Sequence, residues 1–168
     1  TLFMTGLRIG EAIGLLDKDV NTDERYIIVR QSKNGTERIV PLSESVSDAC
    51  VQYRILKKDK IKSKIECKLF FVKNNNTHCS QGAAYKSFRD ALRLAGIPHG
   101  GKGCGPRLHD LRHTFATLAL QNGVDVKTVS SMLGHYDAGF TLRTYTHAMR
   151  QKQDEAAQTM GSFMAQVM

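Results

Sequence analysis

Two short β-rich runs flank an Asn-Gly pair in a sequence that otherwise favours helices. They occupy residues 26–30 and 38–42 of the segment RYIIVRQSKNGTERIVPL, on either side of Asn34 and Gly35. Asn-Gly readily adopts the positive φ angles of a tight hairpin turn, so the pattern predicts two antiparallel strands. Pro41 suits the end of the second strand, because proline donates no backbone hydrogen bond.

Helical patterns fill most of the remaining chain. The apolar stripe of the first helix, which stops near Asp17, is Leu7, Ala12, Ile13, Leu15 and Leu16. Later helices are expected after Ser43 and Ser80, between Asn122-Gly123 and Gly134, and from Phe140 through about Ala157. We therefore expect an α+β fold, mostly helical, with a small antiparallel β-sheet or hairpin in the N-terminal third and a single domain over residues 1–168.

The charge of the chain is strongly basic. Lys and Arg number 24 against 16 Asp and Glu, giving a net charge of +8 and a pI of about 9.5. This balance favours a nucleic-acid partner, although a basic domain without one is the alternative. The cysteines form no C-x-x-C pair, which favours reduced thiols in a cytoplasmic protein, and no apolar run reaches the roughly 18 residues of a membrane span.

The segment LHDLRHTFATLAL, residues 108–120, is compatible with a metal site, a phosphate site or a plain buried helix. His109 and His113 share a helix face, and HDLRH resembles the zinc-hydrolase motif H-E-x-x-H. Asp110 is shorter than the Glu that serves as a base in such sites, and Arg112 would place a fixed cation beside the metal. We therefore disfavour a metal site and expect no cofactor.

Residues suited to phosphodiester chemistry are distributed along the chain. A reacting phosphodiester gathers negative charge that planar guanidinium groups stabilise, and it needs a nucleophile and a proton donor. Arg112 follows His109 by one helical turn, so both can face one anion. Further candidates are Arg8, Lys33, His135 and Tyr145. Taken singly, each of these four has a plainer interpretation as a surface charge, a helix cap or a core residue, and His113 is assigned to helix packing or hydrogen bonding.

Together, these segments resemble the tyrosine recombinase (phage integrase) family. The matching pieces, in the family's order, are TGLRIGEAIGL, SKNGTERIVPL, LHDLRHTFATLAL, SSMLGHYD and TYTH. One departure is that HYDAGFTLRTY lacks the Ser-Thr-Thr run more common before the tyrosine. The resemblance spans about residues 1–150 and implies the catalytic-domain fold of the family. Because the chain starts without Met inside a helical pattern, we expect a fragment that lacks N-terminal DNA-binding domains and, further, the first helices of the catalytic domain.

The resemblance implies a covalent mechanism on DNA. Tyr145 would attack a phosphodiester to give a 3′-phosphotyrosyl link and a free 5′-hydroxyl. His109 would accept the tyrosine proton or orient the tyrosine oxygen, and Lys33 would protonate the leaving 5′-oxygen. A phenol with an ordinary pKa of about 10 is a weak nucleophile at neutral pH, so it needs such help. The covalent link conserves the energy of the broken bond, so rejoining needs neither ATP nor a metal.

The resemblance also implies how the anion is held. Arg8 and Arg112 would clamp the non-bridging oxygens, His135 would donate to one of them, and Glu11 would position an arginine. Basic residues expected to contact the phosphate backbone, with a solvated charged face as the alternative, are Arg38, Lys86, Arg89, Lys102, Arg107 and Lys127. Lys86 and Arg89 lie one helical turn apart and so share a face.

The function favoured by this resemblance is that of a site-specific DNA recombinase or integrase. The alternatives are type IB topoisomerase-like strand relaxation and a non-catalytic DNA-binding regulator. The expected partners are double-stranded DNA, further copies of the chain in a homotetramer with exchange of the apolar tail TMGSFMAQVM, and accessory DNA-bending or directionality proteins. We expect no membrane association and a cytoplasmic location at the nucleoid.

Overall fold

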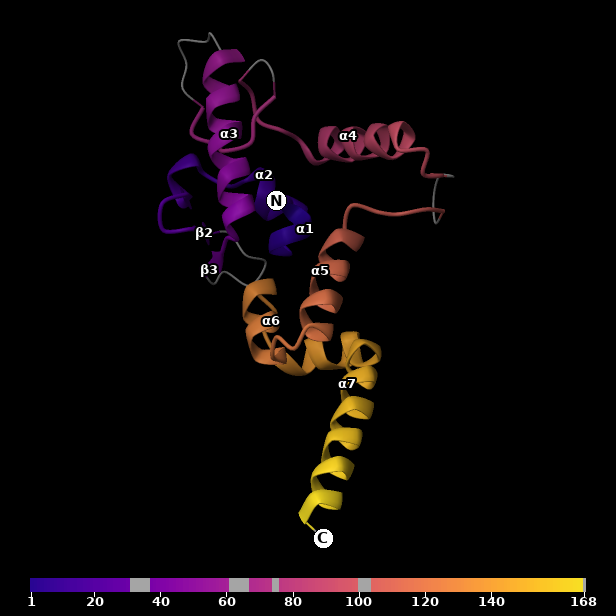
Figure 1. Ribbon diagram of the computed structural model, residues 1–168. Coiled ribbons are helices and arrows are strands. Elements are labelled where there is room, and N and C mark those ends of the chain that lie inside the picture. Colours follow the sequence, from indigo (N-terminus) through magenta and orange to yellow (C-terminus); the bar gives the residue numbers. More distant parts are fainter. Residues whose placement is uncertain (31–36, 61–66, 74–75, 100–103, 168) are drawn as a thin grey trace.

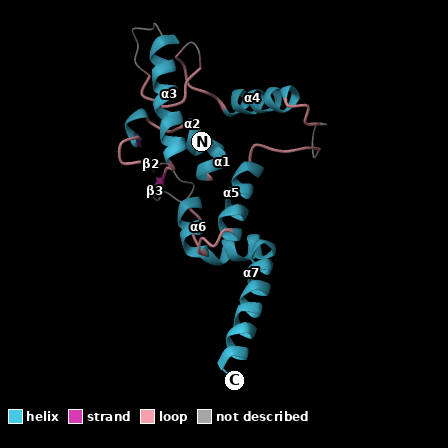
Figure 2. Cartoon of the chain, viewed as in Figure 1, coloured by secondary structure: helices cyan, strands magenta, loops and turns pink. Residues whose placement is uncertain are grey.

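A computed structural model describes residues 1–30, 37–60, 67–73, 76–99 and 104–167 (Figure 1). Its helices are α1 (Leu2–Thr5), α2 (Ile9–Ile13), α3 (Glu44–Lys60), α4 (Gln81–Leu94), α5 (Asp110–Gln121), α6 (Val126–Leu133) and α7 (Ala138–Val167). Its strands are β1 (Val20–Asn21), β2 (Tyr26–Val29) and β3 (Arg38–Pro41), and a short 3₁₀ helix, η1 (Asp17–Asp19), precedes β1. Helices dominate the described residues (Figure 2), which confirms the α+β expectation.

The three strands form one small antiparallel sheet in the order β1-β2-β3. Ile27 on β2 lies opposite Val40 on β3, and both side chains are fully buried, so this face of the sheet covers the core. The hairpin predicted over residues 26–30 and 38–42 is confirmed, while its turn at 31–36 lies outside the described residues.

Two clusters of buried side chains stabilise the chain. The first lies against the sheet and α3 and includes Leu7, Leu15, Ile27, Val40 and Phe70. The second joins α5, α6 and the start of α7 through Ala116, Leu120, Val129, Leu133 and Tyr145. Helix α1 packs against α5 and so connects the two parts, while the later turns of α7 extend away from the body (Figure 1).

Several helix boundaries follow from local chemistry. The Ser80 hydroxyl accepts from the backbone N–H of Ala83 at 3.2 Å, which confirms the predicted cap of α4. Asp125 caps α6 in the same way by accepting from the N–H of Thr128 at 2.9 Å. Gly134 ends α6 as expected.

The predicted bounds of the first and the last helix were wrong. The early helix is broken, because Gly6 adopts φ 64° at the end of α1 and only Ile9–Ile13 then forms α2. Helix α7 continues to Val167 rather than ending near Ala157, although Tyr145 interrupts it with φ −116° and ψ 20°. Among the described residues, we find no helix with the length and apolar character that crossing a bilayer requires.

Candidate active site

The two arginines predicted to clamp an anion converge on the end of α6. Arg112 on α5 donates to the carbonyl oxygens of Leu133 and Gly6, each at 2.7 Å. Arg8, between α1 and α2, donates to the same Leu133 oxygen at 3.3 Å and to the Gly134 oxygen at 3.4 Å. One carbonyl oxygen therefore accepts from both guanidinium groups, which places them side by side.

The end of α6 attracts cations for a general reason. A helix leaves its last carbonyls without intrahelical partners and carries partial negative charge there. Gly134 turns the chain with φ 64°, a conformation that favours glycine, and a Cβ at this position would lie 2.7 Å from Nη1 of Arg38. The glycine of the LGH segment therefore ends the helix and also leaves space for a third arginine.

Glu11 links that third arginine to Arg8. Its carboxylate accepts from Nη1 and Nη2 of Arg38 at 3.0 and 2.7 Å, and from the backbone N and Nη1 of Arg8, both at 2.9 Å. Burial opposes ionisation of Glu11, but these hydrogen bonds and the charge of Arg38 outweigh it and lower its pKa. Glu11 is thus an ionised, buried anchor for two guanidinium groups, as the sequence predicted for one of them.

Arg38 departs from its predicted place at the DNA surface. Its side chain is only 9% exposed, and its Nε donates to the Met132 carbonyl at 2.9 Å while both Nη atoms bind Glu11. Arg38 begins β3 beside the end of α6, so its donors face inward. We therefore remove Arg38 from the expected DNA contacts and assign it to positioning Glu11 and the α6 terminus.

His135 follows this terminus directly. Its Nδ1 lies 2.6 Å from the hydroxyl of Thr141, a fully buried residue that the sequence analysis had not singled out. Burial, and then the charges of Arg112 and Arg8, lower the pKa of His135 to about 4. A neutral imidazole that accepts from Thr141 at Nδ1 carries its proton on Nε2, where it can donate to an anion.

Tyr145 lies where α5 and α7 meet, with only 2% of its surface exposed. Its hydroxyl is 2.9 Å from Nδ1 of His113, and the two rings are tilted with centroids 5.8 Å apart. Burial raises the pKa of Tyr145, and the nearby charge of Arg112 offsets this only in part. His113, assigned to packing or hydrogen bonding from the sequence, is therefore the residue that binds the candidate nucleophile.

His109 occupies the N-cap position of α5 and is exposed. Its ring meets that of His113 edge-on, with centroids 4.9 Å apart. Partial desolvation, followed by the charges of His113 and Arg112, lowers the pKa of His109. Among the described residues, the hydroxyl of Tyr145 is hydrogen-bonded to His113. The family resemblance implied His109 as the partner of this hydroxyl.

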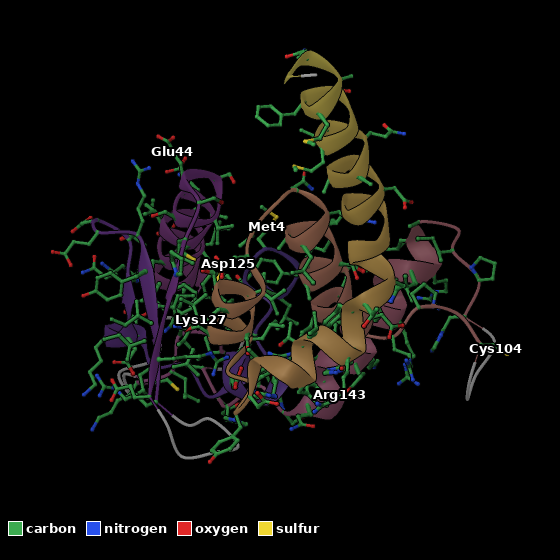
Figure 3. All side chains as sticks on the ribbon, turned by 90° about the horizontal axis from the view of Figure 1, so that it is seen from below. Met4, Glu44, Cys104, Asp125, Lys127 and Arg143 are labelled. Carbon is green, nitrogen blue, oxygen red and sulfur yellow. The ribbon has the colours of Figure 1, made fainter. Side chains whose placement is uncertain are left out.

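The remaining predicted cations differ in accessibility. Lys86 and Arg89 are exposed on α4. Lys127, labelled in Figure 3, is exposed on α6. Arg107 is 70% exposed although it forms an ion pair with Asp110 at 3.0 Å. Lys33 and Lys102 lie outside the described residues. No group of three or more His, Cys, Asp and Glu side chains within the described ranges is arranged to hold a metal ion.

Comparison with known proteins shows the family of the chain. A sequence model described as the phage integrase family matches residues 1–152. The chain belongs to the phage integrase (tyrosine recombinase) family. The tyrosine recombinase XerD of Brucella abortus is 34% identical over 152 residues, which are 90% of this chain and 47% of that relative.

Solved members of the phage integrase family share the fold. The crystal structure of XerA recombinase superposes with a TM-score of 0.76 at 30% identity, covering 92% of this chain and 55% of that one. The Tn1549 transposon integrase, solved in complex with circular intermediate DNA, gives a TM-score of 0.73 at 27% identity, covering 95% of this chain and 57% of that one. The chain spans about half the length of the curated relatives it matches.

Proposed function

We propose that this chain is the catalytic domain of a site-specific recombinase that cleaves and rejoins DNA through a 3′-phosphotyrosyl intermediate. The observation that carries the proposal is the convergence of Arg8 and Arg112 on one carbonyl, beside His135 and the α5–α7 contact of Tyr145. Two adjacent guanidinium groups match the charge that a reacting phosphodiester gathers. The DNA-bound state of the Tn1549 integrase, a structural neighbour, supports double-stranded DNA as the substrate.

The two arginines would hold the phosphate differently. The bonds of Arg8 to the Leu133 and Gly134 carbonyl oxygens are long, at 3.3 and 3.4 Å, so a charged phosphate oxygen can replace them. The bonds of Arg112 are short, at 2.7 Å, and each of its Nη atoms keeps a second N–H. Arg112 would therefore stay fixed to the protein and offer its remaining donors, while Arg8 turns toward the phosphate.

The proton transfers complete the reaction. Tyr145 gives its proton to a neighbouring histidine as it attacks phosphorus, the bond from phosphorus to the 5′-oxygen breaks, and the leaving oxygen takes a proton from Lys33. His135 donates from Nε2 to a non-bridging oxygen throughout. The reverse steps join the phosphate to a new 5′-hydroxyl and free the tyrosine, so the number of phosphodiester bonds is unchanged.

A suicide substrate tests the proposal. On cleavage, a duplex that is nicked beside the scissile bond of a cognate site loses the short fragment carrying the new 5′-hydroxyl. The 3′-phosphotyrosyl adduct therefore accumulates and migrates slowly in a denaturing gel. We expect an adduct that forms in EDTA and is absent in Tyr145→Phe. Tyr136→Phe is the matched control, because Tyr136 is 94% exposed and lies outside the contact between α5 and α7.

The alternatives give different products. A type IB topoisomerase-like enzyme would form the adduct and relax supercoiled DNA without exchanging strands between two sites. A DNA-binding regulator would bind the site and form no adduct at all. An adduct that persists in Tyr145→Phe, or cleavage that requires a divalent metal, contradicts the proposal.

The proposal extends to the partners of the domain. The exposed side chains of Lys86, Arg89, Arg107 and Lys127, with Lys102, would contact the phosphate backbone and set position rather than sequence preference. The extended end of α7 carries the exposed apolar residues Met160, Phe163 and Met164. We propose that it docks on a neighbouring copy in a homotetramer on DNA, assisted by accessory DNA-bending or directionality proteins, at the nucleoid of the cytoplasm.

A further inference from the structure

We propose that His113, and not His109, is the base that takes the proton of Tyr145. The proposal rests on the recombinase function proposed above and concerns how its nucleophile is activated. The distance of 2.9 Å between His113 Nδ1 and the Tyr145 hydroxyl is within the reach that proton transfer needs. A nucleophile already hydrogen-bonded to an imidazole in the free protein is the arrangement by which weak hydroxyl nucleophiles are activated.

The geometry of α5 separates the two histidines. His113 lies one turn after His109, is half-buried, and faces α7 through its contact with Tyr145. His109 is exposed at the N-terminus of α5, and its ring meets the His113 ring edge to face. His113 thus contacts both the ring of His109 and the phenol of Tyr145, whereas His109 is exposed to solvent.

The surroundings of the phenol explain why a base is needed. Burial raises the pKa of Tyr145, and the charge of Arg112 offsets only part of this rise. The phenol therefore has no route to ionisation at neutral pH unless a neighbouring group accepts its proton during attack. Among the described residues, the charged and titratable groups that face His113 are His109, Asp110, Arg112 and His135, together with Tyr145 itself.

The purely structural reading is that a buried tyrosine hydroxyl needs some hydrogen-bond partner. In that reading, any group that bonds the phenol would serve, and the direction of the hydrogen bond would not matter. The base assignment is stricter, because Nδ1 of His113 must be unprotonated so that it accepts from the hydroxyl. The free protein must then hold the tautomer with its proton on Nε2.

The step balances in protons and bonds. The proton of the Tyr145 hydroxyl moves to Nδ1 of His113 as the bond from Oη to phosphorus forms and the bond to the 5′-oxygen breaks. The 5′-oxygen takes its proton from the group assigned to Lys33. In the rejoining step His113 returns its proton to Tyr145, so neither histidine changes its net protonation over a full cycle.

A kinetic comparison of glutamine variants tests the assignment. His113→Gln keeps a hydrogen-bonding side chain but cannot accept a proton, and His109→Gln is its matched variant on the same helix. We expect His113→Gln to melt near the wild-type temperature and bind the DNA site normally. Single-turnover adduct formation should nevertheless fall about 10²- to 10⁴-fold. In a plot of rate against pH, the loss of rate on the acid side (the acid limb) should disappear in His113→Gln and remain in His109→Gln.

A modified substrate shows which oxygen His113 serves. A 5′-bridging phosphorothiolate leaves as a thiolate and needs no protonation, so it rescues defects in the leaving-group acid and not defects at the nucleophile. We expect His113→Gln to stay slow with this substrate. Rescue of His113→Gln by sulfur, or loss of the acid limb in His109→Gln in place of His113→Gln, overturns the proposal.

A measurement without DNA keeps the two proposals separate. The ¹⁵N chemical shifts of His113 in the free protein should show a proton on Nε2 and an unprotonated Nδ1, and Tyr145→Phe should shift the Nδ1 resonance. A protonated Nδ1 at neutral pH overturns the base assignment even if the wild type forms an adduct. Failure of the wild type to form any adduct, with the expected tautomer present, contradicts the recombinase function instead.

Discussion

Replacing Glu11 with glutamine should lower the free energy of unfolding far more than the same replacement of an exposed glutamate. The Glu11 side chain is 3% exposed and accepts hydrogen bonds from Arg8 and Arg38 at 2.7 to 3.0 Å. Glutamine has nearly the same volume but turns one acceptor oxygen into an NH₂ donor that faces guanidinium N–H groups. The variant would therefore leave two cations without their shared anion.

The magnitude follows from the burial of each partner. Removing one member of a buried ion pair costs about 3–5 kcal/mol, because an uncompensated charge stays behind. The Arg38 side chain is 9% exposed, so the full cost of an uncompensated charge applies to it. The Arg8 side chain is 27% exposed and keeps partial contact with water, which reduces that cost. We expect a loss near the lower figure, about 3 kcal/mol, which for a chain of this size lowers Tm by about 6–12 °C.

Urea and thermal unfolding at neutral pH provide the assay. The matched control is Glu44→Gln, because the Glu44 side chain is 75% exposed and its contact with Arg25 spans 3.8 Å, so its change should be within about 0.5 kcal/mol. A folded-state pKa below 4.5 means that the stabilisation by Glu11 is present above pH 4.5 and is lost as the pH falls through the lowered value. An equal effect of the two substitutions would refute the reasoning.

Two further predictions follow from the site and the tail. The pKa of His135 is about 4 in the folded chain against an ordinary 6.5. Between pH 6.5 and 4 only the unfolded chain binds this proton, so the free energy of unfolding should fall as the pH is lowered over that range. The fall should be less steep in His135→Asn, and urea titrations at several pH values measure it. Deleting residues 158–168 should leave adduct formation on a suicide duplex intact but reduce tetramers on DNA in native gels. Undiminished tetramers would contradict tail docking.

The parts of the fold that the sequence predicted are those governed by neighbouring residues. The hairpin, the Ser80 cap and the Gly134 helix end each depend on a few consecutive residues with specific backbone preferences. The break after α1 was missed because a helical pattern was expected from the first residues of the chain, while the chain turns at Gly6 with positive φ. A hydrophobic pattern alone does not distinguish one helix from two short ones.

The partners inside the site were harder to predict because they come from distant segments. Arg38 follows a predicted hairpin turn, which suggests an exposed cation, and only the packing of β3 beside α6 shows that its donors face Glu11 and Met132. His113 on a helix with apolar neighbours suggested packing, and only the return of α7 brings Tyr145 to its ring. Residue type indicated which side chains could carry phosphodiester chemistry, whereas their hydrogen-bond partners required tertiary structure.

The last turn of α6 explains why these distant segments meet. The carbonyls of three consecutive residues, Met132, Leu133 and Gly134, accept from arginines that belong to β3, α5 and the α1–α2 connection. Each of these bonds joins one part of the fold to another and also fixes the candidate site, in which Arg8 and Arg112 are proposed to hold the phosphate and Arg38 positions Glu11. Because the same bonds serve both purposes, substituting any of the three arginines should reduce stability together with cleavage. Measurements of activity at these positions are therefore interpretable only alongside the unfolding free energy of each variant.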